Sequence, residues 1–294
     1  MDIEFKTSEN ARKLLYVYGL KLALSPMYKE IVADVADDKS PPNLKFEEFL
    51  QSDVDVPLDV TDPRMRLEAD QDFFTNIETG VEVEFKKCGA ELDRQMPKML
   101  GFPAPKKLVV VLAEDPNPGG SRGTSFPSRY EDTALIGMII GKDWSSEKGL
   151  ARNSKTITCA MIHEMLHSRL FRYEFIDYNK HKNDACDTFG EVLLEYFAPI
   201  GILTQEIGLL KEMPVRKYHE INTRNRPELT QTSEDLLSSI EKYSRDLHSK
   251  DLSGQTIWEF LKRTDDKESG KFKEFINLEP LNDLKPPKTK SRNV

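Results

Sequence analysis

The clearest hydrophobic pattern in the chain lies between residues 73 and 96. Apolar side chains recur there at steps of three and four positions, at Ile77, Val81, Phe85, Cys88, Leu92 and Met96. This spacing places them on one face of an α-helix, and such a face is normally buried against a core. Because Pro97 lacks a backbone hydrogen-bond donor, we expect the helix to end at Met96.

Two short apolar runs follow this helix. Residues 108–113 and residues 134–140 are rich in Val, Leu and Ile and are bounded by Asp, Pro and Gly. This composition predicts two buried β-strands. Residues 119–125, between the two runs, are interpreted as a flexible loop that helps to shape a cleft, because they are rich in Gly and Ser.

Helical periodicity returns after the second strand. Residues 156–171 predict a helix with Asn153 or Ser154 as its N-cap. A second helix is predicted over residues 183–198, since Asn183 is a suitable N-cap and Pro199 cannot continue a helix. The order of elements is therefore helix, strand, strand, helix, helix, which indicates an α+β fold with a small sheet packed on helices.

The remaining segments flank this central unit. Further surface helices are predicted over residues 233–247 and 256–262. The chain then divides into a helical cap with a linker (1–64), the central unit (65–213), a helical segment (214–283) and a disordered basic tail (284–294).

Charge and composition narrow the expected partners. The formal net charge is −8, which argues against a surface that coats nucleic acid or anionic lipid. The sequence contains no uninterrupted apolar run of the length that crosses a membrane, and its three cysteines are widely spaced. We therefore expect a cytoplasmic protein, or an effector secreted without a cleaved signal.

Residues 163–167 read HEMLH and carry the clearest chemical signal in the chain. On a helix, His163 and His167 project from the same face one turn apart, so both imidazoles can reach one tetrahedral zinc ion. Glu164 lies beside the open position of the metal, where it can take a proton from the water that zinc activates. This arrangement predicts hydrolysis of a peptide bond with Glu164 as the general base.

Catalytic zinc usually has three protein ligands, so a third ligand is expected downstream. Glu191 and Glu195 lie four residues apart on one helical face. Glu191 can therefore bind the metal while Glu195 accepts a hydrogen bond from a ligand histidine. His181 is the main alternative ligand, and Asp177 and Asp187 are further candidates, because all of these side chains bind zinc.

HEMLH followed by a helix that bears Glu191, Glu195, Tyr196 and Phe197 resembles the gluzincins, the thermolysin- and aminopeptidase-like branch of the zincin peptidases. The resemblance covers about residues 105–200. It implies a zincin-like catalytic domain, one Zn²⁺ per chain, Glu164 as base and Glu191 as third ligand. Because no exopeptidase signature is visible in the sequence, we expect an endopeptidase. The resemblance also implies that an edge strand, expected at residues 134–140, binds the substrate backbone by strand addition. Gly190 stands where this family often has Asn.

Two other readings remain open. With His181 as third ligand the motif is similar to the SprT and Spartan proteases, which act on protein bound to DNA. Alternatively, the chain is a non-catalytic zincin-like domain that binds a partner. In either peptidase reading, Tyr218, His219 or Arg216 is a candidate to stabilise the oxyanion, because each can donate a hydrogen bond.

Overall fold

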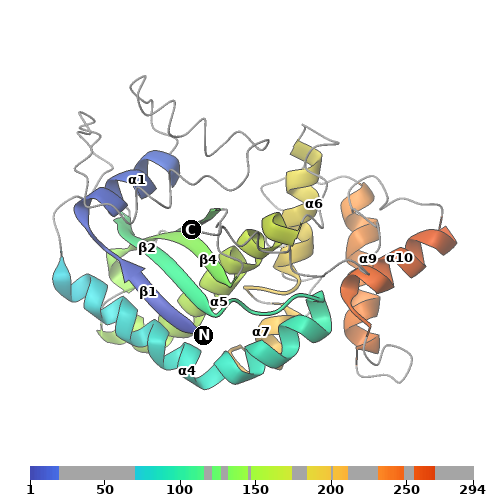
Figure 1. Ribbon diagram of the computed structural model, residues 1–294, viewed down its shortest axis with the longest axis horizontal. Helices are drawn as coiled ribbons and strands as arrows, with labels where there is room; N and C mark the ends of the chain where they lie inside the picture. Colours follow the sequence, from blue (N-terminus) through green and yellow to red (C-terminus); the bar gives the residue numbers. More distant parts are fainter. Residues whose placement is uncertain are drawn as a thin grey trace, which may run out of the picture.

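Figure 1 shows a computed structural model of the chain. The structure describes residues 1–19, 70–115, 121–126, 132–144, 147–173, 184–199, 201–210, 231–247 and 255–268. Within these ranges the fold is α+β, with a small mixed sheet and helices on both of its faces. Residues 20–64 of the predicted helical cap and linker (1–64) and the predicted disordered tail (284–294) lie outside the described residues.

The sheet has four strands in the order β1 (Asp2–Lys6), β2 (Lys107–Asp115), β4 (Thr133–Gly141) and β3 (Ser121–Phe126). β1, β2 and β4 are parallel, and β3 runs antiparallel to β4. All nine residues of β4 are buried, which explains its continuous apolar run. The strands predicted at residues 108–113 and 134–140 are confirmed as parts of β2 and β4.

The position of the sheet edge differs from the sequence-based expectation. We expected residues 134–140 to form the edge strand, but β4 is an interior strand between β2 and β3. The expected loop at residues 119–125 is also wrong for its described part, because residues 121–125 belong to β3. β3 forms through pairing with β4, with Gly123 opposite Met138, and its own sequence SRGTSF carries little strand signal.

Helices cover the two faces of the sheet (Figure 1). α1 (Glu9–Gly19) packs on one face against β2 and β4. α5 (Glu147–Tyr173) packs on the opposite face against β4 and β3, and α4 (Gln71–Leu100) packs against α5. A short 3-10 helix, η1 (Lys142–Trp144), follows β4 and also contacts α5.

The predicted apolar face of α4 is confirmed, since all six of its predicted positions are buried. The predicted end of the helix at Met96 is wrong, because Pro97 lies inside the last turn, which runs on to Leu100. Burial of Leu100 favours this extra turn, and Gly101, at φ 74°, closes it in the left-handed conformation. The indole nitrogen of Trp258 donates to the Leu100 carbonyl oxygen at 2.8 Å, so that this end carbonyl is satisfied.

The helices that carry the predicted site differ from expectation at their ends. α5 begins at Glu147, so Asn153 and Ser154 lie inside the helix and neither is the N-cap. α6 (Asp184–Glu195) ends three residues before the predicted end at residue 198. Residues 196–199 form a turn, and α7 (Ile202–Glu206) follows.

Two further helices belong to the same core. α9 (Gln231–Asp246) packs against α6, and α10 (Ile257–Glu268) packs against α9 and α4. The helices predicted at residues 233–247 and 256–262 are confirmed, but α10 runs on to Glu268. The buried apolar face of α9 includes Tyr243, and that of α10 includes Trp258. None of the described helices is long and apolar enough to cross a membrane.

Candidate metal centre

Helix α5 brings His163 and His167 together. Their side chains are 12% and 10% exposed, and their Nε2 atoms lie 3.1 Å apart. Met165 and Leu166, between the two histidines in sequence, are fully buried in the core, as their apolar character predicted. The helix therefore has an apolar face that fixes it in the fold and a second face that presents both imidazoles.

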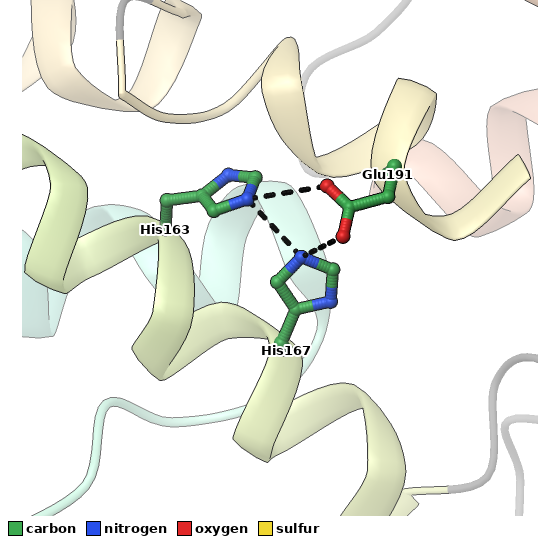
Figure 2. A group of neighbouring side chains, drawn as sticks. All are labelled: His163, His167 and Glu191. Carbon is green, nitrogen blue, oxygen red and sulfur yellow. Dashed lines mark hydrogen bonds and ion pairs between the residues drawn. The ribbon is translucent and has the colours of Figure 1, made fainter. Parts of the chain in front are cut away.

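Helix α6 adds Glu191 to this pair, as Figure 2 shows. One carboxylate oxygen lies 3.5 Å from Nε2 of His163, and the other lies 3.2 Å from Nε2 of His167. Among the described residues, these three side chains form the one group of at least three metal-compatible residues whose ligand atoms converge, all within 4.8 Å of one another.

The spacing of these atoms fits a zinc site. Ligand atoms about 2.0–2.1 Å from a tetrahedral metal are separated from one another by about 3.3–3.4 Å. The three observed separations are 3.1, 3.2 and 3.5 Å. Two imidazoles and one carboxylate are also a common ligand set of catalytic zinc, in which the fourth position stays open. The residues present therefore fit the metal that the HEMLH motif implies.

The outer nitrogen of His163 is fixed by the backbone. Its Nδ1 lies 2.9 Å from the carbonyl oxygen of Ala198. A carbonyl oxygen only accepts hydrogen bonds, so Nδ1 must carry the proton, and the Nε2 lone pair of the neutral ring is directed at the metal position. The role of Glu195 as the anchor of a ligand histidine stays a prediction. The sequence does not predict the contact with Ala198, because it involves a backbone carbonyl and no particular side chain.

Electrostatics couple His163 to Glu191 when no metal is bound. Burial alone would lower the pKa of His163, but the Glu191 carboxylate and the nearby Glu164 charge raise it to about 9. Burial would raise the pKa of Glu191, yet its contacts with the two histidines hold that pKa well below its usual range. Glu191 is therefore a carboxylate over the whole physiological range, as a metal ligand must be.

The side chain of Glu164 extends from α5 to strand β3. A Cβ atom built on Gly123 would meet Oε1 of Glu164 at 2.2 Å, so this carboxylate rests directly against the backbone of β3. Four residues along the same face of α5, Ser168 donates a hydrogen bond to the Phe126 carbonyl oxygen at 3.0 Å and ties β3 to the helix. Burial raises the pKa of Glu164, which makes it a stronger base near neutral pH.

The other candidate residues are not brought into this group by the described part of the chain. His181, Asp177, Arg216, Tyr218 and His219 lie outside the described residues. Asp187 lies in α6, one turn before Glu191, and its side chain is likewise outside the description. Gly123 was also missed as a site residue, because the contact between β3 and α5 arises only in the folded sheet.

Comparisons with protein-family models, with curated proteins and with solved structures found no match to this chain. The geometry of the four side chains and their surroundings therefore carries the functional argument.

Proposed function

We propose that this chain is a zinc-dependent metallopeptidase that hydrolyses peptide bonds within protein or peptide substrates. The observation that carries the proposal is the convergence of His163, His167 and Glu191 at separations suited to one tetrahedral zinc ion, with Glu164 beside them. Glu191 comes from a different helix, so the grouping is a tertiary feature and does not follow from the HEMLH spacing itself.

Each residue of the group has a distinct task in the proposed reaction. His163, His167 and Glu191 hold the ion, and His163 is oriented by its hydrogen bond to the Ala198 carbonyl oxygen. When bound, zinc would supply a Lewis acid that activates water and polarises the carbonyl of the scissile bond. Glu164 would accept a proton from the attacking water and deliver it to the amine that leaves when the C–N bond breaks.

Strand β3 supports the binding of an extended substrate. It is the edge strand next to Glu164, and Gly123 within it is exposed, whereas Phe126 at its end is buried. An edge strand can pair with an extended peptide through its backbone, and a glycine lets that peptide approach closely. We therefore transfer the proposed strand addition from residues 134–140 to β3. A mixed sheet with an antiparallel edge strand above the helix of the HEMLH motif is consistent with a zincin-like domain.

Peptide hydrolysis can be tested without a known substrate. The purified, zinc-loaded chain is incubated with a defined mixture of peptides of varied sequence, and mass spectrometry identifies new termini. We expect internal cleavage by the wild-type chain and a loss of at least about 100-fold in Glu164→Gln, which keeps the size of the side chain but removes the base. A chelator-treated wild-type sample provides the matched control.

Two results would contradict the proposal. Equal cleavage by wild type and Glu164→Gln would mean that Glu164 is not the base. Zinc binding without any cleavage, over a broad range of peptides and folded proteins, would favour the non-catalytic zinc-binding domain instead.

A further inference from the structure

The turn that follows α6 holds the backbone atom that orients His163. The amide nitrogens of Phe197 and Ala198 both donate to the Leu194 carbonyl oxygen at 2.9 Å, which continues the end of the helix as a tight turn. The next two bonds fold the chain back over this turn. Ile202 donates to Tyr196 O at 2.6 Å, and the Thr204 amide donates to Phe197 O at 3.2 Å.

Gly201 is required where the chain folds back. A Cβ atom at this position would lie 1.9 Å from the Tyr196 carbonyl oxygen and 2.5 Å from the Phe197 amide nitrogen. Both are backbone atoms, so no side-chain rotation can relieve the overlap. Any larger residue at position 201 must therefore displace the 196–198 backbone or the start of α7.

Thr204, in α7, makes a side-chain hydrogen bond at the same turn. Its hydroxyl donates to the Gly201 carbonyl oxygen at 2.9 Å, and its side chain is fully buried. Phe197 and Ala198 are also fully buried, so water has no access to replace a lost bond within the turn. The Thr204 hydroxyl thus holds Gly201 to the start of α7, and the Thr204 amide joins this start to Phe197, in the segment that presents Ala198.

These contacts lead to His163, one of the proposed zinc ligands. The Ala198 carbonyl oxygen lies 2.9 Å from Nδ1 of His163 and selects the tautomer whose Nε2 lone pair points to the metal. We infer that Gly201 and Thr204 are positioning residues for His163 and that they act on zinc affinity through the Ala198 carbonyl. The inference rests on the zinc site of the proposed function. It says that the turn after α6, which contains no zinc ligand itself, orients His163.

Zinc affinity is the readout, because it needs no substrate. The dissociation constant is measured by competition with a chromophoric chelator for wild type, Gly201→Ala, Thr204→Val and Thr204→Ser. Loss of an outer contact of a metal ligand typically weakens metal binding by about 10–100-fold. We expect a loss in this range for Gly201→Ala, a loss near its lower end for Thr204→Val, and wild-type affinity for Thr204→Ser, which keeps the hydroxyl.

Thr158→Val is the matched control. Thr158 is fully buried in α5, the helix of the ligand histidines, and its hydroxyl has no hydrogen-bond partner in the described part of the chain. The same isosteric change should therefore leave zinc affinity unchanged at this position. Unfolding of each metal-free variant is followed by circular dichroism, so that a purely structural role, which lowers stability but leaves the affinity of the folded protein intact, is recognised.

The outcomes separate the two proposals. If the wild-type chain itself binds no zinc, the proposed function fails. If wild type binds zinc and folded Thr204→Val binds it equally tightly, only the role of this turn is overturned. Should Gly201→Ala fail to fold, the Thr204→Val and Thr204→Ser pair decides alone.

Discussion

Zinc binding at the His163 site should release a proton at neutral pH. Without metal, Glu191 and Glu164 raise the pKa of His163 to about 9. Because this pKa lies above the pH of the assay, the ring is protonated and its Nε2 must lose a proton before it can bind zinc. Glu191 contributes no proton, since its lowered pKa keeps it ionised. The affinity for zinc should therefore rise with pH until the pH passes about 9.

The size of the effect follows from the fraction of protonated His163. With a pKa of about 9, only about 1% of the ring is neutral at pH 7 and about half is neutral at pH 9. Competition by this one proton should therefore make the apparent affinity about 50-fold higher at pH 9 than at pH 7. At pH 7 the binding of each zinc ion should release about one proton from His163.

Calorimetry and chelator competition measure the two quantities. Zinc titrations at pH 7 in buffers of different ionisation enthalpy count the protons released, and chelator-buffered zinc gives the dissociation constant between pH 7 and pH 9. In Glu191→Gln the raised pKa of His163 should fall back, so this variant should release fewer protons at pH 8. Zinc binding by the wild-type chain with no proton release at pH 7, and with the same affinity at pH 9, would refute the reasoning.

Three further predictions concern single side chains. Glu191→Gln should weaken zinc binding more than Glu195→Gln does in the same chelator assay, because only the Glu191 carboxylate converges with both histidines; equal losses would count against Glu191 as a ligand. Gly123→Ala should abolish peptide cleavage while zinc content stays that of wild type, because the added Cβ overlaps the base, and retained cleavage would show that the base is not held there. Trp258→Phe should lower the free energy of unfolding by about 1–3 kcal/mol in urea denaturation, since the Leu100 carbonyl loses its buried partner, and an unchanged unfolding midpoint would contradict this.

The sequence predicted those elements whose burial is visible in a local pattern. The face of α4 follows from apolar residues at helical spacing, and β2 and β4 follow from apolar runs that are buried on both sides of the sheet. Pro97 misled the prediction because tertiary burial of the following residues outweighs its cost in the last turn.

Two strands were missed for different reasons. β3 is a polar strand that depends on pairing with β4, so no periodicity marks it. β1 alternates polar and apolar residues over DIEFK, which is a strand signal, but five residues are too few to separate it from the adjoining helix. Pairing between distant segments placed both strands, and a single sequence contains no direct record of such pairing.

The candidate site also has a part that the sequence predicts and a part that depends on the folded structure. The HEMLH spacing places His163 and His167 on one helical face, which is a local property of the sequence. Selecting Glu191 required the additional assumption that α5 and α6 pack side by side, and the structure brings these three residues together. The Ala198 carbonyl and Gly123 act through backbone position alone, so no residue type at either position points to the site.

The zinc content of the purified, tag-free chain is the most direct test of this account. Elemental mass spectrometry of the wild-type protein should find about one zinc per chain, either as isolated or after reconstitution and removal of loosely bound metal. Persistent absence of zinc after reconstitution would contradict the account, because the convergence of His163, His167 and Glu191 would then serve only as an ion pair between the two helices.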